Sequence, residues 1–146
     1  MNRLNTLAMT TIAVLFLGVA PTRMAAGDTQ VKQLIGPWRL VYATNGPAKL
    51  RVFTAGDGPT IVMLPGQGFG PSSLEPLAER LLMAGFRVVL PEPRGYGESV
   101  GPLDGVTLRD LGADVARAIE SGGGGPVVLA GHAFGNRVAR LLASDR

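Results

Sequence analysis

The stretch that decides the fold is Pro126-Val-Val-Leu-Ala-Gly-His-Ala-Phe-Gly135, followed by Arg137-Val-Ala-Arg-Leu-Leu142. The apolar run 126–130 is typical of a buried strand, and the apolar residues after Gly135 recur at helical spacing. Gly131 and Gly135 stand two residues on either side of Ala133, where side chains would collide with the strand or the helix in a sharp turn. The stretch therefore predicts a strand that turns abruptly into a helix, with Ala133 displayed at the C-terminal edge of a sheet.

Strand patterns precede this turn from about Trp38 onward. The runs 39–44 and 50–54 flank the turn pair Asn45-Gly46 and predict a hairpin of two strands. Short continuous apolar runs at 61–64 and 86–90 predict two buried strands.

Helical patterns separate these strands. We expect Ser73 to cap a first helix, which carries a leucine stripe and stops at Gly85. Thr107 with Asp110 is expected to open a second helix, which ends at the glycine run 122–125. The alternation predicts an α/β fold with a mostly parallel sheet covered by helices on both faces.

Composition fits one folded domain and excludes several kinds of site. The chain has 146 residues, of which 46% are hydrophobic and 17% charged. The absence of cysteine excludes disulfides, thiolate metal sites and a cysteine nucleophile, and a single histidine, His132, argues against a histidine metal site. We therefore predict no metal and no cofactor.

The charge balance does not indicate nucleic-acid binding. The net charge is only +3, and Arg3 and Arg23 lie in an N-terminal segment that is predicted to be removed. All acidic residues lie at Asp28 or later, so the remaining chain is nearly neutral and offers no phosphate-binding face.

Residues 1–26 have the layout of a signal peptide. A positive start at Arg3 precedes an uncharged stretch, 4–22, and the small residues Ala25-Ala26-Gly27 follow. An uncleaved membrane anchor is the alternative. Residues 27–37 are interpreted as a linker, and we expect a secreted or periplasmic protein without a membrane partner after cleavage.

The turn at 131–135 resembles the nucleophile elbow, G-x-S-x-G, of the α/β-hydrolase family. Leu64-Pro-Gly-Gln-Gly-Phe-Gly70 is similar to the family's oxyanion loop, and Glu92-Pro-Arg-Gly-Tyr-Gly-Glu-Ser99 to its D-x-R-G-x-G-x-S stretch. The three motifs occur in the family's order. The resemblance implies that residues 38–146 form the N-terminal part of an α/β-hydrolase domain, with strands 1 to 5 of the family order only.

The resemblance also implies which residues form the site. Gly131, His132 and Gly135 would shape the elbow around Ala133, which occupies the nucleophile position. The backbone N–H groups of Gln67 and Phe134 would form the oxyanion hole.

The departures from the family pattern predict a chain that is inactive by itself. The Ala133 methyl group can neither attack a carbonyl nor be activated by a base, and Pro65 stands where the family has a loop histidine. His132 is interpreted as a packed elbow residue whose side chain points into the fold. Because the sequence ends soon after the elbow helix, we expect strand 127–130 to be an exposed apolar edge, as in the N-terminal part of a longer protein or the product of a truncated gene.

Two functions of different classes remain open. By lineage the protein is a hydrolase of ester or related acyl bonds; the alternative is a non-catalytic protein that binds a small ligand in the hydrolase pocket. Both imply a small-molecule partner, and neither indicates an oligomeric state. A dinucleotide-binding reading of Gly66, Gly68 and Gly70 with Glu92 is disfavoured, because the third glycine falls one residue early and Pro71 follows it.

Overall fold

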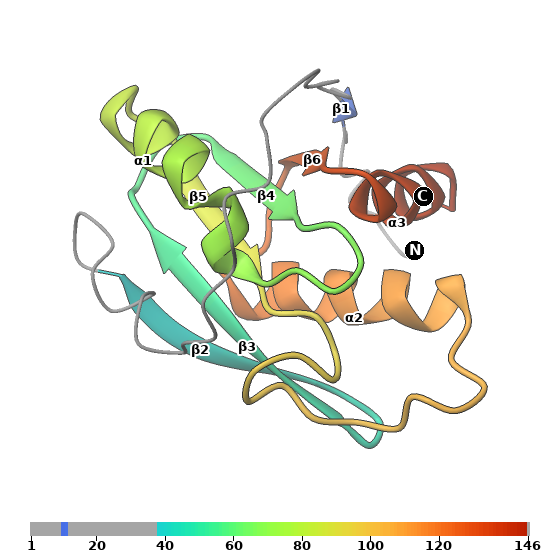
Figure 1. Cartoon of the computed structure of the whole chain (residues 1–146). Coiled ribbons are helices and arrows are strands. Elements are labelled where there is room, and N and C mark those ends of the chain that lie inside the picture. The colour runs from blue at the N-terminus through green and yellow to red at the C-terminus, as the bar shows by residue number, and fades with distance from the viewer. Residues whose placement is uncertain (1–9, 12–37, 146) are drawn as a thin grey trace, which may run out of the picture.

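A mixed sheet with helices packed around it makes up the part of the chain that the computed structural model describes, residues 10–11 and 38–145 (Figure 1). In this part the sheet order is β1-β6-β4-β5-β3-β2. The strands are β1 (Thr10–Thr11), β2 (Arg39–Asn45), β3 (Ala48–Ala55), β4 (Thr60–Leu64), β5 (Arg87–Pro91) and β6 (Val127–Gly131). The helices are the 3-10 turn η2 (Pro71–Leu74), α1 (Glu75–Met83), α2 (Leu108–Ser121) and α3 (Phe134–Ser144).

The sheet is mostly but not purely parallel. β4 pairs in parallel with β5 on one side and with β6 on the other, so β4 lies at its centre. β3 pairs antiparallel with β5 and with β2, and Gly46, with φ of 56°, permits the tight turn between β2 and β3. The predicted hairpin and the three predicted buried strands are confirmed.

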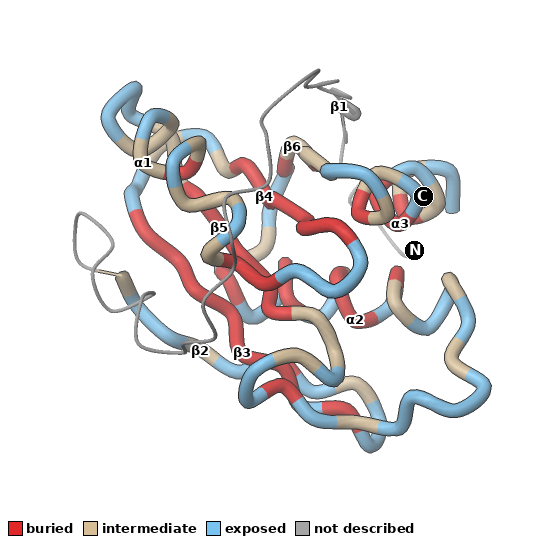
Figure 2. Tube along the Cα trace, viewed as in Figure 1, coloured by how far each residue is buried: buried red, intermediate tan, exposed pale blue. Residues whose placement is uncertain are grey.

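The two faces of the sheet build two separate cores because successive strand residues point to opposite sides. On one face Val62, Leu64 and Val89 pack with residues of α2 and α3. On the other face Met63 and Leu90 pack with residues of α1. Figure 2 shows the buried residues running along the central strands and the inner sides of the helices. Helices therefore cover both faces, as the sequence predicts.

The helix starts agree with the sequence in one case and differ in the other. Thr107 accepts a hydrogen bond from the Asp110 N–H while Asp110 accepts one from the Thr107 N–H, so the capping box of α2 is confirmed. The expected Ser73 cap is wrong. The turn η2 runs directly into α1, and the Ser73 hydroxyl donates back to the Gly70 carbonyl at 2.7 Å instead.

The outer edge of β6 also differs from the expectation. Thr10 and Thr11 pair in parallel with Val128 and Leu129, so part of this edge is covered. Open N–H and C=O groups along an edge strand form a template for such pairing. The rest of the predicted signal peptide and the predicted linker 27–37 lie outside the described residues. No helix in the described part is long and apolar enough to cross a bilayer.

Candidate functional site

The turn between β6 and α3 is the most strained point of the described backbone. Ala133 has φ of 48° and ψ of −113°, and it is the only non-glycine residue with positive φ between residues 38 and 145. Such a conformation costs an alanine roughly 1–3 kcal/mol and is found mainly at functional sites. The strand-to-helix turn that the sequence predicts is present, and Ala133 stands at its apex with an exposed side chain.

Both flanking glycines are required by close backbone contacts. A Cβ atom on Gly131 would lie 2.5 Å from the Asn136 nitrogen. A Cβ atom on Gly135 would collide with the backbone carbonyl oxygens of Leu64 and Pro65. Gly131 therefore lets the strand turn tightly into α3, and Gly135 lets α3 pack directly against the end of β4.

The side chain of His132 is exposed, whereas the sequence predicts that it packs into the fold. Its N–H donates to the Leu64 carbonyl at 2.9 Å, which ties the turn to β4, but its side chain is exposed. The expectation of a packed side chain is wrong, because β6 has no described neighbouring strand at this level: β1 pairs only with Val128 and Leu129. The imidazole instead lies beside Gly66, with Nδ1 3.3 Å from the position that a Gly66 Cβ would take.

The loop after β4 lies next to the elbow. The Phe69 N–H donates to the Gly66 carbonyl at 3.1 Å, and Gly68 has φ of 76°, so residues 66–69 form a tight turn. Among the described residues, neither the Gln67 N–H nor the Phe134 N–H donates a hydrogen bond. The structure thus places the two expected oxyanion donors on a loop and an elbow that contact each other, and their N–H groups have no acceptor among the described residues; their role stays a prediction.

A cavity of about 370 Å³ opens beside these two donors. Gln67 and Phe134 both line it, and most of its wall is apolar or aromatic; the wall includes Phe69, Tyr96, Leu103, Val106, Leu111, Val115 and Val138. A pocket of this size fits a small organic molecule whose polar group would face the donors.

One part of the cavity wall is an ion pair between a loop and a helix. Arg94 Nη2 and Nε donate to Asp114 Oδ1 and Oδ2 at 2.8 and 2.9 Å, and both side chains are more than nine-tenths buried. Asn45 adds a hydrogen bond to Asp114 Oδ1 at 2.8 Å. The hydrogen bond to Asp114 raises the pKa of Arg94, and the bidentate pair fixes the loop around Arg94 on α2.

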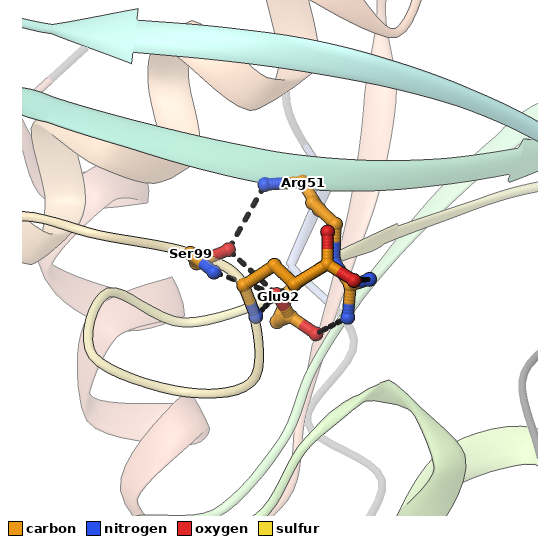
Figure 3. Close-up of polar contacts among 4 residues, drawn as sticks. Arg51, Glu92 and Ser99 are labelled. Carbon is orange, nitrogen blue, oxygen red and sulfur yellow. Dashed lines mark hydrogen bonds and ion pairs between the residues drawn. The ribbon is translucent and has the colours of Figure 1, made fainter. Parts of the chain in front are cut away.

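A second buried cluster, which includes Arg51, Glu92 and Ser99, holds the same loop (Figure 3). Arg51 of β3 donates to both carboxylate oxygens of Glu92, at 3.0 and 2.5 Å. Glu92 Oε2 also accepts hydrogen bonds from the backbone N–H groups of Glu98 and Ser99 and from the Ser99 hydroxyl. Glu92 therefore folds the loop 92–99 back on itself.

Sequence reasoning recognised the 92–99 motif but missed its partner. Arg51 lies 41 positions before Glu92, and only the register between β3 and β5 brings them together. The one available signal was an arginine between the apolar residues Leu50 and Val52 of a strand.

The loop that contains Gly66, Gly68 and Gly70 does not have the form of a dinucleotide-binding turn. The chain passes from Gly70 into the short turn η2 at Pro71 rather than into a long helix. A Cβ atom on Gly70 would collide with the Tyr96 ring, so packing of Tyr96 accounts for this glycine. Within the described residues, no group of three or more His, Cys, Asp or Glu side chains is placed to hold a metal ion.

Comparison with known proteins agrees with this architecture. Residues 61–146 match the model of the alpha/beta hydrolase family. The chain is 33% identical over 107 residues to a protein named as a carbamate hydrolase, RutD, from Variovorax paradoxus, covering 73% of this chain and 37% of that protein. It is 36% identical over 111 residues to an AB hydrolase superfamily protein, YfhM, from Bacillus subtilis, covering 70% and 37% respectively.

A solved structure shows the same likeness. The epoxide hydrolase VrEH1 from Vigna radiata superposes with a TM-score of 0.66 at 29% identity, over 72% of this chain and 33% of that one. The chain thus spans about a third of the length of these relatives. By its family match, its sheet order and its sequence identity to hydrolases, this chain belongs to the alpha/beta hydrolase family.

Proposed function

We propose that this chain carries the carbonyl-binding part of a hydrolase site for a small molecule with an ester or related acyl group, and that the site forms no covalent intermediate. The observation that carries the proposal is Ala133. The chain forms a strained elbow, but the residue at its apex presents a methyl group and no nucleophile. A methyl group cannot attack a carbonyl, whereas backbone N–H groups can still stabilise an oxyanion.

The relatives support a carbonyl-containing substrate. One is named as a carbamate hydrolase, and a carbamate carries a carbonyl group. The cavity beside Gln67 and Phe134 is large enough for a small apolar body attached to such a group.

A second candidate function is non-catalytic binding of a small ligand. Ala133 also favours this candidate, because an alanine at the apex of the elbow supplies no nucleophile while the apolar cavity is present. The two candidates differ in one observable, since a binding protein is stabilised by its ligand without converting it.

Two measurements test the proposal. The chain is titrated with acetophenone, a ketone without a leaving group, and the ¹H–¹⁵N resonances of Gln67 and Phe134 are followed; we expect both to shift with saturation. It is then mixed with 4-nitrophenyl acetate, and peptides covering 131–135 are mapped by mass spectrometry. An acetyl group on these residues, or unchanged Gln67 and Phe134 resonances, would contradict the proposal.

We also propose that the protein is exported from the cytoplasm. The support is the layout of residues 1–26, with a positive start, an uncharged apolar stretch and small residues before Gly27. N-terminal sequencing of the protein recovered from the periplasm or medium should begin at Gly27. A start at Met1 with the protein in the cytoplasm would exclude export.

A further inference from the structure

Three aromatic side chains from separate segments of the described chain line the cavity. Phe69 lies in the loop after β4, Tyr96 in the loop after β5, and Phe134 at the start of α3. The Phe69 ring lies against Gly66, since an ideal Cβ atom on Gly66 would be 3.5 Å from Phe69 Cδ2, and the Tyr96 ring packs over Gly70. Aromatic rings attract a second ring by offset stacking or edge-to-face contact, beyond the area that they bury. The wall is therefore suited to a ligand that carries an aromatic ring.

The cavity runs from the surface to the core. Gln67 and Phe69 are exposed, whereas Leu50, Val115 and Val138 in the same wall are buried members of the core formed with α2 and α3. A ligand whose carbonyl group contacts Gln67 thus extends its remaining atoms toward apolar side chains. A charged group on those atoms would lose its hydration and would need a partner inside the cavity.

The charged residues of the wall already have partners. Of the described residues that line the cavity, Glu92, Arg94 and Asp114 carry a charge. Both carboxylate oxygens of Asp114 accept hydrogen bonds from Arg94, and Arg94 Nη1 also donates to the Pro102 carbonyl at 3.2 Å. Both carboxylate oxygens of Glu92 accept hydrogen bonds from Arg51. Each carboxylate of the wall thus faces a guanidinium group, and these three residues offer no unpaired charge to a ligand.

We propose that this cavity selects an uncharged aromatic acyl compound, whose ring lies among Phe69, Tyr96 and Phe134. This inference rests on the proposed carbonyl-binding function and names the substrate class of the same site. A cationic ligand is the competing class, because the face of an aromatic ring attracts cations. The structure disfavours it, since an arginine neutralises each carboxylate of the wall.

The first test compares ketones of matched shape that differ in charge. 4-Acetylbenzamide and 4-acetylbenzoate form one pair, of which only the second is anionic at pH 7. 4-tert-Butylacetophenone and 4-acetyl-N,N,N-trimethylanilinium form the other, of which only the second is cationic. Dissociation constants come from the shifts of the Gln67 and Phe134 resonances in ¹H–¹⁵N spectra. We expect each charged ketone to bind at least about tenfold more weakly than its neutral partner, because its charge loses water in the cavity. If neither member of a pair binds, the isomers substituted at position 3 replace them.

The second test separates an aromatic ring from apolar bulk. Acetophenone and cyclohexyl methyl ketone both carry a six-membered ring beside the carbonyl group, but only the first ring is aromatic. We expect acetophenone to bind about 3- to 10-fold more tightly, which is the usual contribution of aromatic contacts.

Two variants show whether the wall causes this preference. Phe69→Leu keeps an apolar side chain at a position that is 40% exposed, and it should reduce the preference at least about twofold, because one of three rings is lost. Met83→Leu is the matched control, at a 74% exposed position on α1 that does not line the cavity, and it should leave the preference unchanged. Thermal unfolding shows which variants are folded; if Phe69→Leu does not fold, the ligand comparisons on the unmodified chain decide the question.

Three results would overturn the inference while the proposed function stands. The first is a charged ketone that binds as tightly as its neutral partner, or more tightly. The second is equal binding of cyclohexyl methyl ketone and acetophenone, and the third is an unchanged preference in folded Phe69→Leu. If acetophenone shifts neither the Gln67 nor the Phe134 resonance, the proposed function itself fails.

Discussion

Arg51 and Glu92 form a bidentate ion pair that is almost wholly buried, with Arg51 Nη2 2.5 Å from Glu92 Oε1. The pair joins β3 to the start of the 92–99 loop, which lines the cavity at Arg94 and Tyr96. Glu92 also accepts hydrogen bonds from the far end of the same loop at Ser99. The shape of this cavity wall thus depends on one buried carboxylate.

Replacing Glu92 by Gln should destabilise the chain strongly. The substitution leaves the Arg51 charge buried without its main partner, and breaking such a pair costs about 3 kcal/mol or more. Glu98→Gln is the control: Glu98 also contacts Arg51, but its side chain is 62% exposed and the loss should stay below about 1 kcal/mol. Urea unfolding measures both, and equal losses would refute the dominant role of Glu92.

Replacing Ala133 by Gly should stabilise the chain. Glycine adopts φ of 48° without the steric cost that alanine bears, and the gain should be about 1 kcal/mol after the added freedom of the unfolded chain is counted. Ala113→Gly, at an exposed position inside α2, should lower stability by a similar amount. Thermal unfolding should show shifts of opposite sign, and a loss of stability in both variants would mean that Ala133 is not strained.

Replacing Gly135 by Ala should disrupt the contact between the elbow and β4. The added methyl group meets the carbonyl oxygens of Leu64 and Pro65, which belong to the backbone and cannot turn aside. We expect a loss of about 3 kcal/mol. Gly112→Ala, with no close neighbour, should be neutral or slightly stabilising. Comparable unfolding midpoints for the two variants would show that the close packing is not required.

The capping box of α2 predicts a pH dependence. Hydrogen bonds from the Thr107 hydroxyl and the Thr107 N–H lower the pKa of Asp110 from its ordinary value of 3.8. Because the folded pKa is the lower one, the stabilisation is present above about pH 4 and is lost as the pH falls through the folded value.

Asp110→Asn should therefore unfold more easily than the unmodified chain at pH 7, with a smaller difference at pH 3. Asp104→Asn, at an exposed loop position, serves as the control. Urea midpoints at the two pH values measure the difference, and a gap between Asp110→Asn and the unmodified chain that is equal at both would exclude the cap as its source.

Local patterns in the sequence predicted most of the fold. The apolar runs, the turn pair at Asn45-Gly46 and the Thr107 cap depend on neighbours within a few residues, and the structure confirms them. The elbow was also predicted from a local pattern, the glycines on either side of Ala133, although the contacts of Gly135 are with the distant residues Leu64 and Pro65.

The parts that the sequence did not predict depend on contacts between distant segments. The Arg51–Glu92 pair and the Arg94–Asp114 pair follow from strand register and from the packing of α2. His132 is exposed because β1, the described strand beside the outer edge of β6, pairs only with Val128 and Leu129. No pattern within residues 126–142 encodes this pairing. The Ser73 cap failed because Pro71 starts a 3-10 turn that leads straight into α1.

A crystal structure of the chain with bound acetophenone would test the central claim most directly. The account predicts the elbow at 131–135 unchanged and the ketone oxygen within about 3.2 Å of both the Gln67 and Phe134 nitrogens, with no bond to Ala133. A ketone oxygen that contacts neither nitrogen, or residues 131–135 in an ordinary loop or a continuous helix, would contradict it.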